Sequence, residues 1–201
     1  MEVRQVDGGF IINFSSGFQY DYFGVFGISL SSPVSRDRLI GVLGSLRGEF
    51  RIQFLNADSI VSWRHVASAA LKALRSFKCG RNISHSIEME LLLYCSGERQ
   101  IKDALRVSGL GEFVKDFVLA VFGSSESEVD NGLKRFLDSC SEAKLNFNVL
   151  FNRSMDHFKH LMELFNVSED ELKSVYKRGL SSWDALEYIL IERGCALEVY
   201  K

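Results

Sequence analysis

A nearly uninterrupted apolar helix, predicted near the middle of the chain, restricts the fold more than any other feature. Its segment, IEMELLLYC, runs from Ile87 to Cys95 and has almost no polar side. A helix that is hydrophobic all round has to be buried among other elements. Ser84 or Ser86 suits its start and Gly97 its end, because serine caps helix N-termini and glycine ends helices. We therefore expect this helix to be the buried centre of the fold.

Short alternating segments predict a sheet around this helix. Glu2–Val6 and Phe10–Phe14 flank Asp7-Gly8-Gly9, a typical hairpin turn. Further strands are predicted at Tyr22–Leu30, which Ser31-Ser32-Pro33 closes, and at Phe50–Phe54, Phe117–Phe122, Leu145–Phe151 and Cys195–Tyr200.

Helical periodicity is present in most of the remaining chain. In the first half of the chain, helices are predicted from Ser35 to Gly48, over Ile60–Phe77, and from Arg99-Gln100 through Ile101, Ala104 and Leu105. In the second half, the capping boxes Ser125/Glu128 and Ser168/Glu171 each predict a helix start, and the second of these helices ends at Gly179. Helical patterns also run from Ser154 onward and over Ser182–Arg193. Interleaved strands and helices predict a single α+β domain over residues 1–201, with a mixed, mostly antiparallel sheet flanked by helices. Residues 1–50 supply the first strands and a short helix, 51–110 the core, and 111–201 a strand-helix unit and a helical C-terminal part.

Composition excludes several classes of protein. Hydrophobic residues make up 46% and charged residues 25% of the 201, which is typical of a globular protein. No run approaches the roughly 18 apolar residues of a membrane span, and the N-terminus does not resemble a signal peptide. The four cysteines contain no Cys-X-X-Cys pair, which favours buried reduced thiols. We expect a cytoplasmic protein, also nuclear if its source is eukaryotic, with no membrane contact.

No catalytic constellation is recognisable. Phosphate-binding loops and a nucleophile elbow are absent. His157 and His160 have the spacing of two metal ligands, but no third ligand is apparent and a surface pair is the preferred interpretation. Cys95 has no obvious activating neighbour. The sequence therefore predicts no catalytic residue, no metal and no cofactor.

The residues between Asp58 and Glu88 form a basic stretch on a protein whose formal charge is only −2. They include five cations and no acidic residue: Arg64, Lys72, Arg75, Lys78 and Arg81. An anion-binding face and a solvated helix face are both consistent with this pattern. His65 is interpreted as part of the basic face or as a hydrogen-bonded histidine.

The turn that follows the apolar helix is a second candidate for anion binding. Cys95-Ser96-Gly97-Glu98-Arg99-Gln100 places backbone N–H groups and Arg99 at a helix start, and helix starts bind phosphates. Lys78 and Arg81 reach the same region if the two helices form a hairpin. The alternative is that Arg99 pairs with the buried Glu90 and fixes the turn, and both interpretations stay open.

The C-terminal part has the opposite charge. From Glu126 to Lys201 there are fourteen acidic and ten basic residues, so a protein partner suits this end better than a polyanion. Trp183, Leu186 and Leu190 are candidate partner contacts, although such residues are more often core.

Several of these segments together resemble one known family. FLNAD before a helix, GRNISHSIEMELLLYCSGERQI and ALRVSG, all within Gln53–Gly109, are similar to the PRPK-binding protein family. That family is the small non-catalytic subunit of the KEOPS (EKC) complex, which makes threonylcarbamoyl-adenosine in tRNA. Two departures are the longer first fifty residues and Cys95, where a small residue is common.

The resemblance implies a two-sided adaptor. One side binds and activates the complex's small kinase or ATPase, and the other holds the single-stranded 3′ CCA end of tRNA. The implied RNA-binding residues, with Lys78 added from the anion argument, are Asn56, Arg64, Lys78, Arg81, Ser96, Gly97, Arg99 and Gln100. Single-stranded ends are bound by base stacking and edge hydrogen bonds, but the sequence does not identify the aromatic residues. The alternatives are a purely protein-binding regulator of the kinase and, less favoured, an enzyme acting on a phosphorylated metabolite.

Overall fold

One antiparallel sheet forms the centre of the fold. The structure, a computed structural model, describes residues 1–46, 49–175 and 180–197. Its strands are β1 (Glu2–Val6), β2 (Gly9–Asn13), β3 (Tyr22–Ser35), β4 (Arg51–Asn56), β5 (Phe113–Gly123) and β6 (Ala143–Leu145). Their order is β1-β2-β3-β5-β4, with β6 paired to β3. All described pairs are antiparallel, because the turns and helical connections reverse the chain, so the expected mixed sheet is wrong in that detail.

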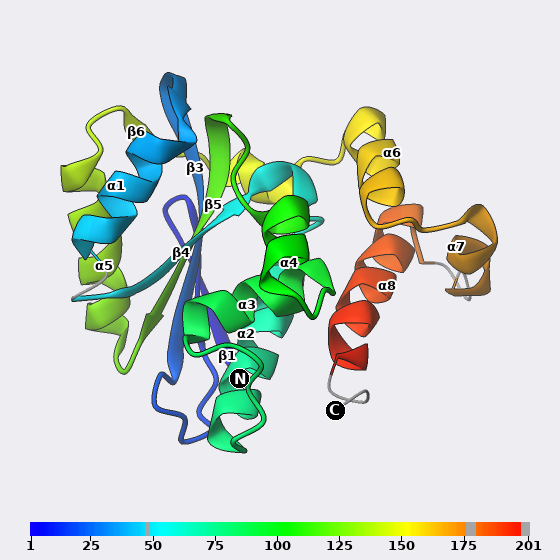
Figure 1. The fold of residues 1–201 in the computed structure, drawn as a ribbon, viewed down its shortest axis with the longest axis horizontal. Coiled ribbons are helices and arrows are strands. Elements are labelled where there is room, and N and C mark those ends of the chain that lie inside the picture. Colours follow the sequence, from blue (N-terminus) through cyan, green and yellow to red (C-terminus); the bar gives the residue numbers. More distant parts are fainter. Residues whose placement is uncertain (47–48, 176–179, 198–201) are drawn as a thin grey trace.

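Helices cover both faces of the sheet (Figure 1). They are α1 (Arg36–Leu46), α2 (Trp63–Lys78), α3 (Ile87–Ser96), α4 (Ile101–Ser108), α5 (Glu126–Ser139), α6 (Met155–Leu164), α7 (Glu169–Val175) and α8 (Ser182–Ala196), with 3-10 turns η1 (Ala57–Ser59) and η2 (Phe147–Phe151). α1 and α5 pack on one face, and α2 and α3 on the other. The predicted α+β fold is confirmed.

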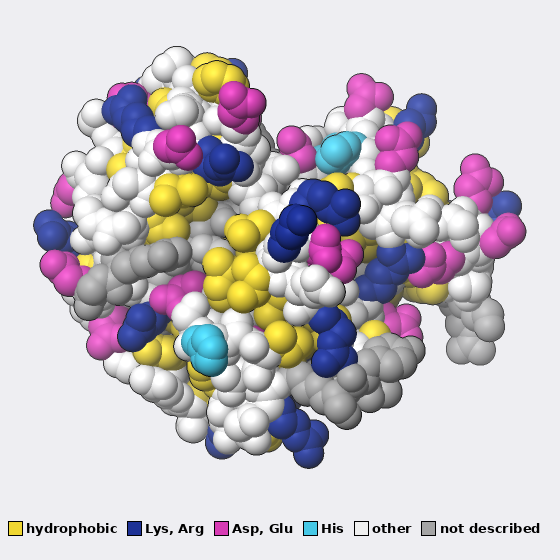
Figure 2. All heavy atoms as spheres, in the orientation of Figure 1, with side chains coloured by type: hydrophobic (Ala, Val, Ile, Leu, Met, Phe, Trp, Pro, Cys, Tyr) yellow, Lys and Arg dark blue, Asp and Glu magenta, His cyan; other side chains and the backbone are white. Residues whose placement is uncertain are grey.

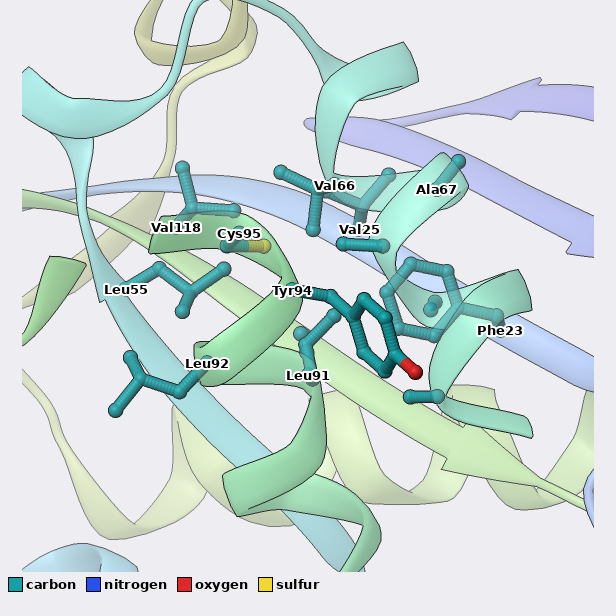
Figure 3. Close-up of a cluster of buried hydrophobic side chains, with 14 of the residues drawn as sticks. Phe23, Val25, Leu55, Val66, Ala67, Leu91, Leu92, Tyr94, Cys95 and Val118 are labelled. Atoms are coloured by element: carbon teal, nitrogen blue, oxygen red, sulfur yellow. The ribbon is translucent and has the colours of Figure 1, made fainter. Parts of the chain in front are cut away.

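α3 is the central buried helix that the sequence predicts. Nine of its ten residues are buried, with Ser86 as N-cap and Gly97 as C-cap. Leu91 and Tyr94 point toward Phe23 on the sheet (Figure 3). α2, α4 and α8 enclose its other sides. None of the described helices is both long and apolar enough to cross a membrane.

The C-terminal helices form a third apolar cluster outside the α2–α4 layer. Residues of α6 and α8 pack against Val61 and against Val107 of α4. Figure 1 shows α6, α7 and α8 side by side at one end of the molecule.

Three predicted strands differ from the structure. β3 continues through Pro33 to Ser35, because the register shift between Ser29 and Val34 removes the need for a ladder hydrogen bond at the proline. In the predicted strand Leu145–Phe151, only the end of β6 is extended. Asn146 accepts a hydrogen bond from the Asn148 N–H and caps the 3-10 turn η2 instead.

The predicted C-terminal strand is also wrong where it can be compared. Cys195 lies inside α8, and Leu197 is the helical C-cap. The rest of that strand, and the helix ends predicted at Gly48 and Gly179, lie outside the described residues. Cys95 and Cys140 are buried as expected, whereas Cys79 and Cys195 are exposed.

Candidate functional site

The buried carboxylate of Glu90 organises the loop between α2 and α3 (residues 79–86, the α2–α3 loop). The backbone N–H groups of Ile83 (3.0 and 3.1 Å) and Ser84 (2.8 Å) donate to it. The Ser76 and Ser84 hydroxyls also lie within hydrogen-bond distance of it, each at 3.0 Å, and each reaches a backbone carbonyl as well, of Ala73 and Ser86. These four groups stabilise a charge that is costly to bury alone. No ion pair between described residues joins Arg99 to Glu90, so the alternative that Arg99 neutralises this carboxylate is wrong.

Lys78 and Arg81 are at the C-terminal end of α2. Gly80, at φ +64°, turns the chain there, and the Arg81 N–H donates to the Ser76 carbonyl at 2.7 Å. The Lys78 ammonium donates to the Ser16 carbonyl at 2.9 Å and lies 5.2 Å from the Phe18 ring centroid. Both side chains are exposed, and Lys78 faces the segment that precedes β3.

The turn between α3 and α4 (Ser96–Gln100, the α3–α4 turn) depends on Gly97. Its φ is +70°, a conformation that favours glycine. The Ser96 hydroxyl donates to the Leu93 carbonyl at 3.0 Å and accepts from the Glu98 N–H at 3.2 Å. Gln100 is the N-cap of α4 but makes no capping hydrogen bond with its side chain. An uncapped helix start of this kind suits an anion.

The α3–α4 turn forms one wall of an open cleft of about 540 Å³, and the α6–α7 connection and the end of α8 form the other. Arg193 fixes that second wall. Its guanidinium donates to the Phe165 carbonyl and to the Glu171 carboxylate, the latter at 2.8 and 3.0 Å. Glu98 and Asp103 line the cleft beside Arg99. The cleft therefore has mixed charge.

The α2–α3 loop and the α3–α4 turn lie at opposite ends of α3. Ten helical residues separate them, which corresponds to about 15 Å of helix length. The structure therefore does not bring Lys78 and Arg81 together with Arg99, and the predicted shared cradle is wrong. The reason is geometric: a helix hairpin puts the loop that joins its helices at one end and the following turn at the other.

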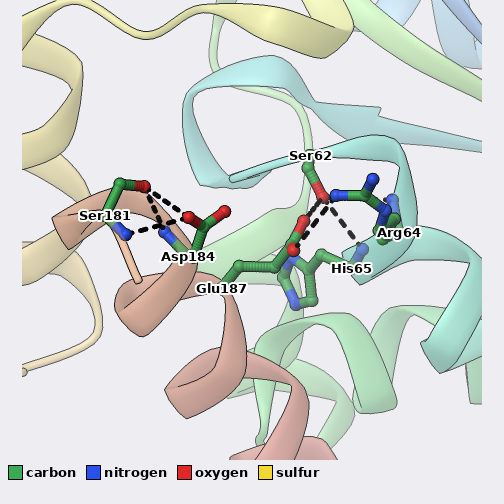
Figure 4. A network of polar contacts seen from close by, with 6 residues as sticks. All are labelled: Ser62, Arg64, His65, Ser181, Asp184 and Glu187. Atoms are coloured by element: carbon green, nitrogen blue, oxygen red, sulfur yellow. Dashed lines mark hydrogen bonds and ion pairs between the residues drawn. The ribbon is translucent and has the colours of Figure 1, made fainter. Parts of the chain in front are cut away.

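Arg64 is joined to the C-terminal helices. Glu187 of α8 reaches the start of α2, where it accepts a hydrogen bond from the Ser62 hydroxyl and lies 3.6 Å from the Arg64 guanidinium (Figure 4). Ser62 also caps α2. Asn56 has a structural contact too, because its side chain accepts the Asp58 N–H and caps η1. Arg64 therefore helps to hold α8 against the start of α2, and Asn56 holds the η1 turn in place.

The basic stretch is weaker in the structure than its sequence indicates. Lys72, expected on a solvated face, is buried, and its ammonium donates to the Ile191 carbonyl at 2.7 Å. Glu187 offsets part of the Arg64 charge. Arg75, Lys78 and Arg81 remain exposed near the end of α2. The positive charge is concentrated at that end.

His65 is neither exposed nor hydrogen-bonded. It is 1% exposed, and neither ring nitrogen has a hydrogen-bond partner among the described residues. Burial, and then the charge of Lys72, lower its pKa to about 4, although the nearby Cys95 backbone opposes the shift. Burial raises the pKa of the Cys95 thiol, which fits an unreactive cysteine. The expectation that His65 belongs to the exposed basic face is wrong, because the ring is buried.

The His157/His160 pair is not a surface pair. His157 is buried, with Nε2 3.3 Å from the Ile60 carbonyl oxygen, and burial is the main cause that lowers its pKa. In the part of the chain that the structure describes, no group of three or more potential ligands is placed to hold a metal ion.

The candidate partner contacts in α8 are mostly core. Leu186 and Leu190 are 0% and 2% exposed and belong to the third apolar cluster. Trp183 is half-buried against Phe158, with ring centroids 5.1 Å apart. A partner cannot contact the two leucines in this structure. The sequence pattern does not distinguish an apolar face that α6 covers from one left open.

The exposed apolar surface lies elsewhere, and sequence reasoning missed it. A groove of about 310 Å³ runs between α1 and α4 over the edge strand β4 (the α1–α4 groove). Figure 2 shows hydrophobic side chains gathered on this face. Ile40, Ile101 and Leu105 are 50%, 42% and 46% exposed. Of Ile101, Ala104 and Leu105, which the sequence predicts within one helix, only Ala104 is buried.

The α+β body thus has an apolar groove and an open cleft of mixed charge. Residues 35–191 match the model of the family described as kinase binding protein CGI-121. The chain belongs to this family.

Individual relatives share shorter regions. An EKC/KEOPS complex subunit CGI121 of Coccidioides immitis is 24% identical over 90 residues, which cover 45% of this chain and 44% of the relative. The subunit of the same name from Yarrowia lipolytica is 24% identical over 78 residues, 39% of this chain and 46% of the relative. The regulatory protein Cgi121 of Methanocaldococcus jannaschii is 37% identical over 59 residues, 29% of this chain and 38% of the relative. The chain thus spans less than half the length of each of these relatives.

Proposed function

We propose that this chain is a kinase-binding regulatory subunit of an EKC/KEOPS-type complex, with no catalytic role of its own. The observation that carries the proposal is the family match over residues 35–191, which includes α1, α4 and both ends of α3. The names of the two fungal relatives support the complex as its setting. The partner is a small PRPK-type kinase or ATPase, whose activity the subunit raises.

The α1–α4 groove supports a protein partner. Exposed apolar side chains from two helices line it, and exposed groups of this kind mark contact surfaces when they are contiguous. Burying Leu105 and Ile40 in a complex would remove apolar area from water, which drives association. We therefore assign the kinase to this groove, in place of the buried leucines of α8.

The second part of the proposal is that the subunit holds the 3′ CCA end of tRNA. Exposed cations at the end of α2 and the uncapped start of α4 support it. The alternative is a purely protein-binding regulator without RNA contact. The ion pair of Arg64 with Glu187 and the burial of Lys72 favour that alternative, since both reduce the positive field.

Kinase binding is tested with the purified chain and the small kinase subunit of the same complex. Leu105→Asp should weaken binding at least tenfold and remove the stimulation of ATP hydrolysis, because it places a charge in the apolar groove. Tyr188→Asp is the matched control, since Tyr188 is 57% exposed on α8, away from the groove. Undiminished binding by a folded Leu105→Asp variant rules out the groove, and no binding by the natural chain rules out the function.

The RNA part is tested by a gel shift that compares intact tRNA with tRNA lacking its CCA end. Preferential retention of intact tRNA, with a steep salt dependence, is the expected result. Equal retention of both RNAs excludes specific binding of the 3′ end. No retention of either, together with normal kinase binding, establishes the purely protein-binding alternative.

A further inference from the structure

The hairpin of β1 and β2 is not used by the function proposed above. Both strands precede residues 35–191, which match the family. Four of the five residues of β2 are buried, whereas the first four residues of β1 are exposed. β1 also ends the strand order, so none of the described strands pairs with its outer edge. An uncovered strand edge is a template for pairing with a further strand.

The hairpin turn determines which backbone groups of β1 face that outer edge. Only two residues form the turn, so Val6 exchanges the first ladder hydrogen bonds with β2. In an antiparallel pair this pattern recurs at every second residue, and Glu2 and Arg4 therefore also direct their N–H and C=O groups toward β2. Val3 and Gln5 direct theirs outward.

The side chains of β1 leave this edge open to pairing. Proteins commonly block an edge strand with a proline, a bulge or charges, above all lysine. β1 contains neither proline nor lysine, and its register with β2 is continuous from Glu2 to Val6. Its two charged residues, Glu2 and Arg4, have opposite signs. A strand with the complementary order of charges therefore fits this edge.

A second copy of β1 has that complementary order. Around a two-fold axis through Val3, the two strands run antiparallel and the two valines lie opposite each other. Because Val3 directs its backbone groups outward, the two valines exchange both of their N–H···O bonds. Glu2 of each copy then lies opposite Arg4 of the other, and opposite charges in this position stabilise a sheet.

The side chains of β1 are already placed for this contact. Arg4 forms an ion pair with Glu126 at the start of α5, which holds its guanidinium on the face of the sheet that Glu2 shares. Both partners of this ion pair remain partly exposed, and a guanidinium has further donors for a second carboxylate. Val3, which is 38% exposed, would be covered by its counterpart.

The other registers of a two-fold pair are less favourable. Only residues that direct their backbone groups outward can share hydrogen bonds, so the axis passes through Val3, Arg4 or Gln5. An axis through Arg4 places the two arginines opposite each other, which is destabilising. An axis through Gln5 places Arg4 opposite Val6 and leaves Glu2 without a charged residue opposite it. The charges therefore select the axis through Val3.

We infer that two copies of this chain associate through β1, as an antiparallel pair centred on Val3 that joins their sheets. The five residues that each copy contributes make a small interface, which is typical of weak association. The α1–α4 groove lies over β4, at the opposite end of the strand order from β1. Self-association and kinase binding are therefore independent.

Analytical ultracentrifugation of the full chain, tagged at its C-terminus, tests the association at about 10 to 500 µM, the range of a weak interface. The average mass should rise with concentration toward that of a dimer. Glu2→Arg and Arg4→Glu should each weaken association by about tenfold or more, because each places like charges opposite one another on both sides of the axis. An equimolar mixture of the two variants should associate again, because every charge then lies opposite its counterpart.

Two results would overturn the inference. One is a natural chain that remains monomeric at every concentration, and the other is a mixture that associates no better than the separate variants. Glu163→Arg makes the same charge change at an exposed position of α6 and is the control, which should associate like the natural chain. Kinase binding by the two β1 variants should be unchanged, so a failure of the proposed function is recognised separately.

Val3→Pro tests the backbone pairing without changing a charge. The Val3 N–H faces outward, so proline removes hydrogen bonds between the copies but none to β2. The variant should remain monomeric and keep the circular dichroism spectrum of the natural chain. In the ¹⁵N-labelled natural chain, the amide signals of Val3 and Gln5 should shift on dilution. Association that persists in Val3→Pro, or dilution shifts confined to α1 and α4, would contradict pairing through β1.

Discussion

The two ends of the α2–α3 hairpin each contain a buried titratable group, and the two groups differ in their hydrogen bonding. Glu90, near the α2–α3 loop, is fully buried and receives hydrogen bonds from two backbone N–H groups, with two hydroxyls also within hydrogen-bond distance. His65 packs under the other end of α3, beside Cys95 and Lys72, with neither ring nitrogen hydrogen-bonded among the described residues. The Glu90 carboxylate is therefore buried together with its hydrogen-bond donors, whereas the His65 ring is buried in its neutral form.

This difference determines how each end of the hairpin is stabilised. The Glu90 contacts fix the α2–α3 loop, so Arg81 is presented from a rigid segment. The other end is held by apolar packing and by Gly97, and its stability depends on His65 remaining neutral. Losing Glu90 should therefore be costly at any moderate pH, whereas the His65 end should be sensitive to acid.

The largest effect is expected from removing the Glu90 carboxylate. Glu90→Ala leaves the backbone N–H groups of Ile83 and Ser84 without an acceptor and opens a cavity, so it should lower the free energy of unfolding by about 3–5 kcal/mol. Urea unfolding followed by circular dichroism measures this. Glu98→Ala, a less buried glutamate at the other end of α3, is the control and should change stability by less than about 0.5 kcal/mol. A similar small change for Glu90→Ala would contradict the role assigned to the carboxylate.

Acid should destabilise the His65 end. The pKa of His65 falls from about 6.5 in the unfolded chain to about 4 in the folded one, so the ring is neutral in both states above pH 6.5. Below that pH the unfolded chain binds the proton first, and stability falls until the pH reaches about 4. The loss approaches about 3 kcal/mol for this one group. His157, whose pKa is also lowered, adds a loss in the same direction.

The difference between the natural chain and His65→Leu isolates this contribution. Urea unfolding at pH 7.5, 6 and 5 should show a smaller loss of stability in the variant. His85→Leu, at an exposed position, should keep the full pH dependence. Parallel curves for the natural chain and His65→Leu would show that His65 does not titrate on unfolding in this range.

The glycines at the two ends give a smaller, matched effect. Gly80 and Gly97 both have a left-handed backbone, at φ +64° and +70°. An added Cβ meets nothing within 4 Å at Gly80 and only ordinary contact with Arg193, at 3.5 Å, at Gly97. Alanine at either position should therefore cost about 1–2 kcal/mol, from backbone strain alone. A much larger cost at Gly97, measured by the same unfolding assay, would mean that the wall formed by Arg193 cannot adjust.

Short sequence patterns predicted the parts of the fold that depend on interactions between neighbouring residues. The burial of α3 and its end at Gly97 follow from composition and from one backbone preference. The strand expected over Leu145–Phe151 failed beyond Leu145, because alternation alone does not reveal that Asn146 caps a turn. Leu186 also failed as a partner contact, because the helix that covers it lies far away in sequence.

The candidate site was less predictable for the same reason. Its charged residues could be named, but their grouping depends on helix direction, which separates Arg81 from Arg99. The cleft at the N-terminal end of α3 is lined by residues near positions 18, 51 and 88, and the α1–α4 groove joins α1 to α4. Such groupings come from sheet topology, and a single sequence does not specify them.

The smallest expected effect tests the separation of the two ends directly. Arg81→Ala and Arg99→Ala should each weaken tRNA binding about fivefold and reduce its salt dependence, as expected for phosphate contacts. Because about 15 Å of helix separates the α2–α3 loop from the α3–α4 turn, the double variant should show the product of the single effects. Gel shifts at several salt concentrations measure all four proteins, with kinase binding as the check on folding. A double variant no weaker than either single variant would indicate that both arginines hold the same phosphate, which the geometry of α3 does not allow without rearrangement.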